Sequence, residues 1–167
     1  MDIVATITAN IESSGSKSLD LSTPSDRVAL ATSTYSFADG TGALSAEQHY
    51  HDRITLTHGA STEVDLFDTL LDAFGDTVSF TKIKVLYLKN NSDAATLIYG
   101  HSAANALAIM ETVGDGGLIG PGGVLLLINP SAAGFACSAG NDLLKLEHDD
   151  ADASDMDVDL YVLGEVT

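Results

Sequence analysis

The chain has no tryptophan, one cysteine and few basic residues among its 167 residues. Cys137 has no second cysteine to pair with, so no disulfide can form within the chain. It lies in a run of small and apolar residues, which favours a buried, inert thiol over a catalytic nucleophile. The lack of tryptophan, with only five tyrosines, argues against a surface built to bind sugars.

Basic residues are scarce: seven Lys and Arg stand against 24 Asp and Glu, which gives a formal net charge of −17. Neutralising phosphates requires a basic patch, so we expect no direct nucleic-acid partner and no anionic membrane partner. The excess of acid indicates a solvated acidic surface, or adaptation to high salt where screening weakens self-repulsion. Charged partners are expected to be basic or bridged by cations.

Long apolar runs and long repeats are also missing. No stretch of eighteen apolar residues occurs, which argues against a membrane span. No basic segment followed by an apolar one stands at the start, which argues against a secretory signal. No repeat of 20–50 residues is visible, which argues against propellers and solenoids. The length predicts a single domain, residues 1–167, with a sizeable core.

The most apolar part of the chain is residues 80–139. Residues 82–89 alternate in character and predict a strand, and residues 95–99 predict a return strand that pairs with it as a hairpin. Residues 124–128 are five aliphatic residues in a row, preceded by Pro-Gly-Gly and followed by Asn-Pro. This run predicts a strand at the centre of a sheet that is covered on both sides.

Shorter strands are predicted on either side of this block. The N-terminal part predicts strands at 2–9, 19–21 and 27–37, with turns at 13–16 and 38–42. Residues 47–57 alternate regularly and predict a half-exposed antiparallel strand. After the block, further strands are expected at 134–137, 143–146 and 158–162.

Between residues 63 and 75 the apolar period changes to that of a helix. Its apolar residues are Leu66, Phe67, Leu70, Leu71 and Phe74. We predict one short helix that ends at Gly75, with a strand over 63–67 as the competing interpretation. Residues 101–110 favour a loop that leads into a strand at 109–113. These elements together predict an all-β chain, an antiparallel β-sandwich of jelly-roll type with one short helix.

One constellation has the residue types of a metal site. Glu47, His49 and His51 share one face of the strand predicted at 47–57, with alternate Cα atoms about 6.5–7 Å apart. Cupin barrels bind metals through a similar His-x-His with a nearby Glu, which would make the chain a metal enzyme. The remaining ligands of that pattern are missing and Arg53 lies on the same face, so a solvated polar face is the preferred interpretation.

A second candidate is the acidic loop 148–157, with Asp150, Asp152 and Asp155 as weak cation ligands. An EF-hand loop needs Gly at position six and Glu at position twelve. Counted from Asp150, those positions hold Asp155 and Tyr161, so the motif fails. A solvated loop is preferred, with a weak divalent site between subunits as the alternative.

No other stretch predicts chemistry. The glycine-rich bends at 114–117 and 120–123 lack the Lys-Ser/Thr of a phosphate loop, and no G-x-S-x-G elbow occurs. We therefore predict no catalytic residues and no cofactor.

The order of segments in the second half resembles small virion structural proteins of tailed phages. The segments are IKVLYLKNNSD, a strand that ends in IYG, PGGVLLLINPSAAGFA, LLKLE and VDLYVLGE, within residues 66–165. The resemblance implies a head decoration, or cement, protein: a homotrimeric, non-enzymatic β-sandwich on the capsid surface that binds the major capsid protein. Such a protein is made in the host cytoplasm. Residues 60–167 would form the core, and residues 1–59 an arm or set of strands for contact with the shell or with other subunits.

Two other functions are weighed against this one. The first is the head of a tail fibre or spike that binds a host glycan, which requires exposed aromatic residues clustered at one place. The second is the cupin-like metal enzyme that would use His49 and His51.

Overall fold

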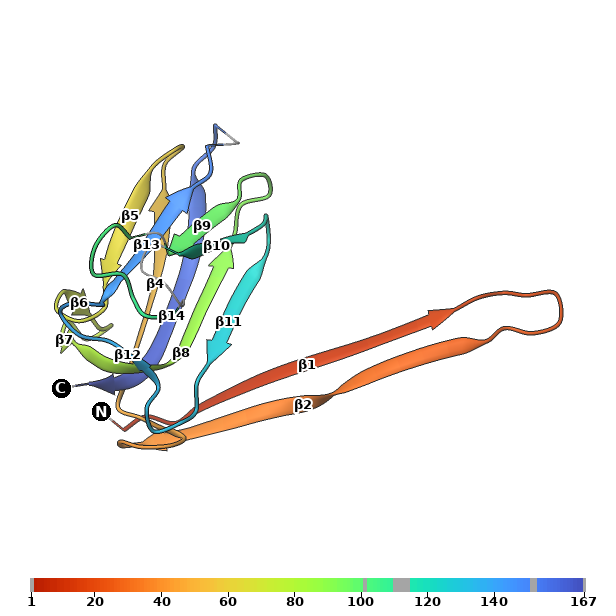
Figure 1. Cartoon of the computed structure of the whole chain (residues 1–167), viewed down its shortest axis with the longest axis horizontal. Coiled ribbons are helices and arrows are strands. Elements are labelled where there is room, and N and C mark those ends of the chain that lie inside the picture. Colours follow the sequence, from red (N-terminus) through yellow and green to blue (C-terminus); the bar gives the residue numbers. More distant parts are fainter. Residues whose placement is uncertain (1, 101, 110–114, 151–152, 167) are drawn as a thin grey trace.

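The structure is a computed structural model that describes residues 2–100, 102–109, 115–150 and 153–166. It contains fourteen β-strands, and no helix occurs within these ranges. Figure 1 shows a sandwich-shaped body with one long hairpin projecting from its lower end. The prediction of an all-β chain is confirmed.

Two sheets stacked face to face form the body. Sheet I has the strand order β11–β8–β14–β4, with the short strand β12 paired to β8, and sheet II has the order β10–β9–β13–β5. Sheet I consists of β4 Gln48–Leu56, β8 Phe80–Asn90, β11 Val124–Ile128, β12 Phe135–Ala136 and β14 Met156–Val166. Sheet II consists of β5 Ser61–Asp65, β9 Leu97–Gly100, β10 Gly116–Ile119 and β13 Leu143–His148.

The topology of these eight long strands is that of a jelly roll. The first, β4, pairs with the last, β14; β5 pairs with β13, β8 with β11, and β9 with β10, all antiparallel. The chain thus runs as one long folded hairpin whose pairs alternate between the two sheets. The predicted jelly-roll sandwich is confirmed.

The main core lies between the sheets and follows from alternation along the strands. On β14, Val158, Leu160 and Val162 are buried against Leu144 and Leu146 of β13, while the intervening β14 residues are partly exposed. Fully burying each such side chain contributes roughly 1.5–3 kcal/mol. This core covers one face of sheet I, and a second cluster covers part of the other face.

The projecting hairpin consists of β1 (Ala5–Ser16) and β2 (Ser25–Asp39), and we call residues 5–39 the arm. Twelve residues at about 3.4 Å each make β1 about 40 Å long. The predicted turn at 13–16 is wrong, because these residues continue β1. The predicted strand at 19–21 is also wrong, because it lies in the loop at the end of the arm, where the Leu19 amide donates to the Ser22 carbonyl at 2.8 Å.

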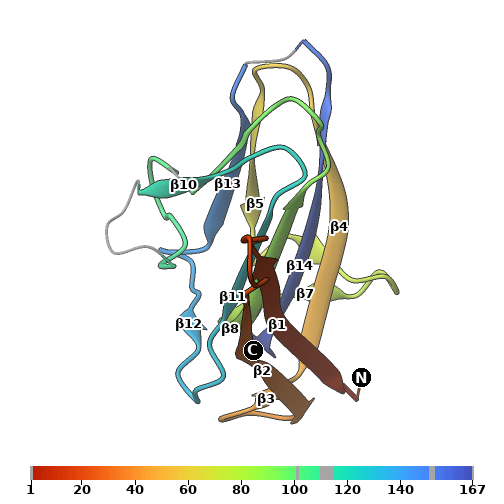
Figure 2. The same cartoon turned by 90° about the vertical axis from the view of Figure 1, so that its right-hand side faces the viewer.

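The arm begins on the outer face of sheet I, the face turned away from sheet II. A second, smaller core joins Ile3, Phe37 and Ala46 to Val85 of β8 and Leu163 of β14. The two-residue strand β3 (Ser45–Ala46) pairs in parallel with the end of β2 at this root. Figure 2, seen from the side to which the arm points, shows β1 and β2 in front of sheet I.

A buried ionic cluster fastens the chain just after the arm to sheet I. Glu165 is 3 % exposed; its Oε2 accepts from Lys82 Nζ at 2.7 Å and its Oε1 from the Gly42 amide at 2.9 Å. Lys84 Nζ lies 2.9 Å from the same Oε1 and donates to the carbonyls of Gly42 and Ser131 at 3.0 and 2.6 Å. Burial alone would raise the pKa of Glu165, but these hydrogen bonds lower it to about 2.

The predicted helix over residues 63–75 is wrong. Strand β5 ends at Asp65, whose Oδ1 accepts the amides of Phe67 and Asp68 at 2.9 and 3.1 Å. A small ribbon of β6 (Leu70–Leu71) and β7 (Thr77–Val78) follows. Aspartate side chains that capture backbone amides favour turns over helix, and this competition overrides the apolar spacing.

Two expectations about the central block are also wrong. Strand β9 does not pair with β8 as a hairpin, because the chain crosses from sheet I to sheet II between them. The buried Asn90 closes this crossing, since its Nδ2 donates to the Ala95 carbonyl at 2.8 Å and to the Ile119 carbonyl at 3.0 Å. Strand β11 is an edge strand and not a central one. Of the strand predicted at 109–113, all but the first residue lies outside the described residues.

Candidate functional site

A row of side chains crosses the outer face of sheet I beyond the root of the arm. Tyr161 of β14 lies directly opposite His51 of β4 and Tyr87 of β8, and Tyr87 lies opposite Leu126 of β11. Directly opposite residues share a face, with Cβ atoms about 4.5–5.5 Å apart. We call these four residues the aromatic row.

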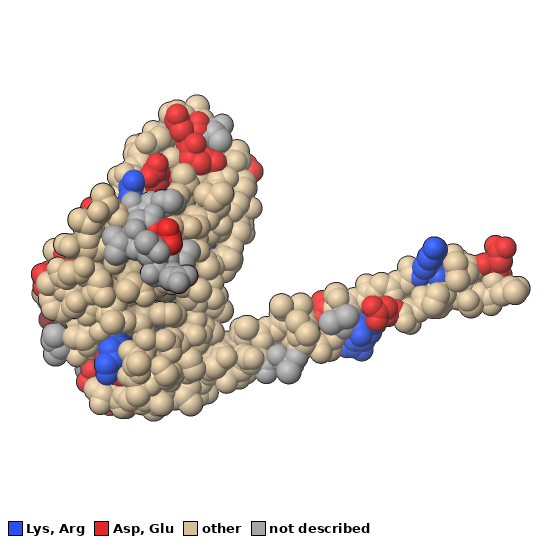
Figure 3. Space-filling model, viewed as in Figure 1, with Lys and Arg blue, Asp and Glu red and all other residues tan. Residues whose placement is uncertain are grey.

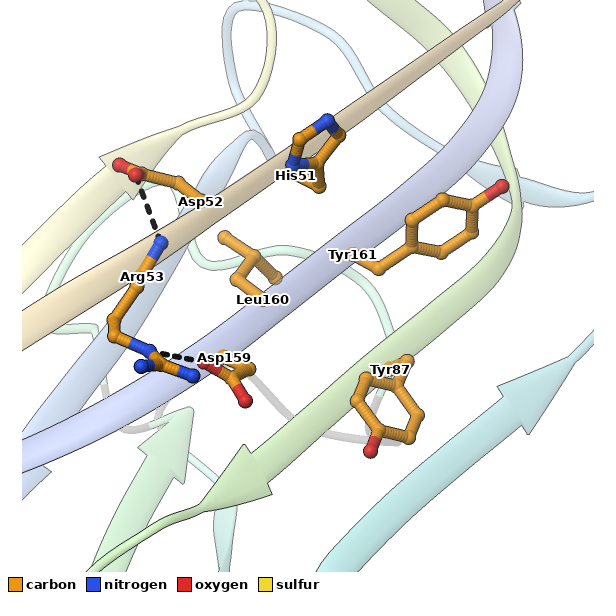
Figure 4. Close-up of a pocket in the computed structure, with 7 residues that line it drawn as sticks. All are labelled: His51, Asp52, Arg53, Tyr87, Asp159, Leu160 and Tyr161. Atoms are coloured by element: carbon orange, nitrogen blue, oxygen red, sulfur yellow. Dashed lines mark hydrogen bonds and ion pairs between the residues drawn. The ribbon is translucent and has the colours of Figure 1, made fainter.

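A charged row runs beside the aromatic row, two residues further along each strand. Asp159 lies opposite both Arg53 and Lys89, and Arg53 Nε donates to Asp159 Oδ1 at 2.7 Å, as Figure 4 shows. The hydrogen bond from Arg53 lowers the pKa of Asp159. Because the Arg53 side chain is well exposed, solvent screens this ion pair and it adds little to stability. Its groups remain free to reorient towards a ligand.

Two concavities flank the aromatic row. One, of about 410 Å³, is lined by His51, Asp52, Arg53, Tyr87, Asp159, Leu160 and Tyr161. The other, of about 440 Å³, lies where the arm leaves the sheet and is lined by Thr6, Ile7, Thr8, Val85, Tyr87, Leu126 and Tyr161. Tyr87 and Tyr161 line both, so the row is continuous with the root of the arm. Tyrosine rings next to ion-paired side chains can bind a ligand or the surface of another protein.

The residues proposed for a metal do not converge. The rings of His49 and His51 lie 5.9 Å apart, and His49 also lies 6.0 Å from the ring of Tyr161. The Glu47 carboxylate is occupied elsewhere, since its Oε2 accepts from the Val166 amide at 3.1 Å. Within the described ranges, no three His, Cys, Asp or Glu side chains are grouped so that they could hold a metal ion.

One end of the acidic loop contacts a histidine side chain. Asp150 Oδ1 lies 2.7 Å from His58 Nε2. The neighbouring His148 is buried, and its Nδ1 accepts the Asp150 amide at 3.1 Å. Asp155 is exposed, and Asp152 lies outside the described residues. The described part of this loop therefore fastens itself to the turn after β4.

Cys137 is buried, as the sequence predicts. Burial, reinforced by the nearby carboxylates Asp142 and Asp65, raises the pKa of its thiol to about 12. A thiol with that pKa is almost entirely protonated at neutral pH, so it is a poor nucleophile.

The resemblance implied an arm or set of strands within residues 1–59, but the strand patterns did not predict one hairpin over residues 5–39. The arm exposes apolar side chains that nothing in the described chain covers: Ile11, Leu19, Leu21 and Leu30. One signal was present, since the alternation of Ala5, Ile7 and Ala9 continues to Ile11, past the end of the predicted strand.

Comparison of the chain with protein-family models, with curated proteins and with solved structures gives no match. Among the described residues, no helix is long and apolar enough to cross a membrane. The arm and the outer face of sheet I are the features that bear on function.

Proposed function

We propose that this chain is a non-enzymatic structural protein of a tailed-phage virion. It acts as a head decoration protein that binds the major capsid protein at the particle surface and stabilises the head. The observation that carries the proposal is the arm, about 40 Å long, which projects from a rigid jelly-roll body. The resemblance of residues 66–165 to virion structural proteins supplies the kind of assembly.

The end of the arm, the loop of residues 17–24, is the part that contacts the shell in this proposal. Leu21 is 100 % exposed and Leu19 is 49 % exposed, in a loop held far from the acidic body. Burying the two leucines in a pocket of the shell would contribute roughly 1.5–3 kcal/mol each. The loop is presented by a paired ribbon, which lowers the ordering cost of binding.

The charge distribution supports the same orientation. The arm carries charged side chains of both signs, whereas on the visible face of the body acidic groups outnumber basic ones (Figure 3). Residues 5–39 carry four acidic and two basic residues, a formal charge of −2 out of −17, so binding through the arm brings little net negative charge onto the partner. The acidic body then faces solvent, in a homotrimer or other closed assembly on the head.

The test is binding to heads assembled from the major capsid protein encoded in the same genome. We expect wild-type protein to sediment with heads, and Leu19→Ser/Leu21→Ser to bind at least tenfold more weakly. The matched control is Leu71→Ser/Leu118→Ser, which removes two exposed leucines from the body. Wild-type protein that stays in the supernatant, or equal binding by all three proteins, would contradict the proposal.

A second candidate function is the glycan-binding head of a tail fibre or spike, and the aromatic row favours it. Tyr87, Tyr161 and His51 lie beside Arg53 and Asp159, which can bond to hydroxyl groups. A glycan array tests this function. A hit that Tyr87→Ala/Tyr161→Ala abolishes would support it, and an array without hits would reject it.

A further inference from the structure

We propose that the arm is also the contact between subunits: the middle of the arm packs on the same part of the arm of a second copy of this chain. We call this part the stem, residues 8–16 of β1 with residues 25–34 of β2. This inference deepens the proposed function, on which it rests, by assigning a surface to self-association. Its test needs no heads, so the two can fail separately.

The stem has one apolar face and one polar face, as the strand register shows. Ala5, Ile7, Ala9 and Ile11 alternate along β1, so their side chains share a face. Ile7 lies opposite Tyr35 and Ile11 opposite Leu30. A register shift between Ala9 and Ile11 adds one residue to β2 and leaves this pairing of apolar residues intact. We call this face the apolar stripe.

The other face of the ribbon is polar. Thr6 lies opposite Ser36 and Thr8 opposite Thr34, whose hydroxyl oxygens are 3.4 Å apart. Further out, Glu12 lies 3.9 Å from Arg27 on the same face. Solvated hydroxyls and an exposed ion pair need no partner. The apolar stripe is therefore the face of the ribbon that would be stabilised by burial against a partner.

The apolar stripe begins inside the protein and continues out of it. At the root, Phe37 is 1 % exposed because sheet I covers it, with Ile7 and Tyr35 partly covered beside it. Along the stem the same face continues with Ala9, which lies opposite Ser33, and with the pair of Ile11 and Leu30, which are 61 % and 55 % exposed. At the root, sheet I packs on the stripe as a second apolar layer. Along the stem, no described part of the chain packs on it.

The second layer is best supplied by another stem. A two-stranded ribbon is marginally stable alone and requires further strands or an apolar partner. The stem can provide that partner because two stripes present the same aliphatic side chains to each other, as a symmetric contact requires. Contact through the stripes also leaves the two edges of each stem ribbon open to pairing with another copy.

Charge favours this contact over contact between bodies. Residues 5–39 contain four acidic and two basic residues, so the arm carries a formal charge of −2 out of −17. Each body carries most of the remaining negative charge of its chain, so two bodies repel each other at low salt. Joining through stems keeps the bodies apart, and we expect the association to strengthen as salt screens the repulsion.

The first experiment measures the mass of the full chain by sedimentation equilibrium at 0.15 and 1 M NaCl. We expect wild-type protein to reach a multiple of its 17.3 kDa chain mass. Ile11→Asp should raise the concentration for half-association at least tenfold, because it would bury a carboxylate in an apolar contact. The matched control is Ala29→Asp, which adds the same charge opposite Glu12 on the polar face and should associate like wild type.

A second measurement detects the contact directly. Cys137 is buried, so a single Cys added on the stem is the reactive thiol of the folded chain. We expect Ile11→Cys to form a disulfide between copies under mild oxidation, and Ala29→Cys to form it at least tenfold more slowly. A monomeric wild type in both salts, or cross-linking that is equal for the two variants, would overturn the proposal.

The two proposals separate in these assays. Leu19→Ser/Leu21→Ser should lose head binding but keep the mass of the wild type. Association that survives without any head binding would reject only the decoration role. Head binding by a strictly monomeric protein would reject only the stem contact.

Discussion

Replacing Glu165 by Gln should destabilise the body and loosen the root of the arm. The carboxylate pairs with the ammonium groups of both Lys82 and Lys84, and Lys84 is fully buried. Removing one partner of a buried ion pair leaves an uncompensated charge and typically costs about 3–5 kcal/mol. We expect a loss of about 3 kcal/mol at pH 7, because the carbonyls of Gly42 and Ser131 still accept from Lys84.

The effect has a defined pH dependence. The pKa of Glu165 is about 2 in the folded protein, against 4.5 for an unperturbed Glu. A lowered carboxyl pKa contributes stability that is present above the unfolded pKa and is lost as the pH falls through the folded pKa. Between pH 5 and 2 the wild type should therefore lose roughly 3 kcal/mol that the Gln variant has already lost.

Urea unfolding of wild type and Glu165→Gln at pH 7, 5 and 3 measures this difference. The matched control is Glu147→Gln, whose carboxylate forms an ion pair with Lys145 near the surface at 2.6 Å and should contribute at most about 1 kcal/mol. The Gly42 amide donates a hydrogen bond to the Glu165 carboxylate, so hydrogen exchange at this amide should be faster in the Glu165 variant. A difference below 1 kcal/mol, or one that does not change with pH, would refute the reasoning.

Three further predictions concern the body. Leu146→Ala leaves a cavity between the sheets and should cost about 2–5 kcal/mol in urea unfolding, because Leu146 is fully buried. Gly164→Ala should destabilise by more than 1 kcal/mol, measured in the same way, because a Cβ there would collide with the Lys82 carbonyl oxygen. Native Cys137 should react with a thiol reagent only as fast as the protein opens, because the thiol is buried and burial raises its pKa to about 12. Unfolding in urea should restore fast labelling. Labelling in native buffer as fast as that of a free thiol would show that the side chain is accessible.

The alternation of apolar residues was enough to predict the sandwich. Strands such as 47–57, 143–146 and 158–162 have one buried face, and this face is visible as a period of two in the sequence. Strand β11 shows the limit of this reasoning. Four of its five aliphatic residues are partly covered although it is an edge strand: Leu125 and Leu127 by the core between the sheets, and Leu126 and Ile128 by the root of the arm. A run of apolar residues reports cover on two faces, and not a place in the middle of a sheet.

The strand patterns did not predict that residues 5–39 form one long hairpin, because these residues have weak local preferences. The sequence ESSGS, residues 12–16, has the composition of a turn, but pairing with residues 25–29 keeps it extended. The aromatic row was missed for a related reason. Residues 51, 87 and 161 are far apart in sequence, and only the register of three strands brings them into line. Pairing register depends on contacts over long sequence distances, and local patterns do not contain it.

The central claim, that the arm attaches this protein to a phage head, is most directly tested by electron cryo-microscopy of heads with and without the full chain. Added density should show the jelly-roll body standing off the shell, with the arm running to the capsid surface and its end loop in contact with the major capsid protein. Heads without added density, or bodies bound to the shell with their arms in solvent, would contradict the account.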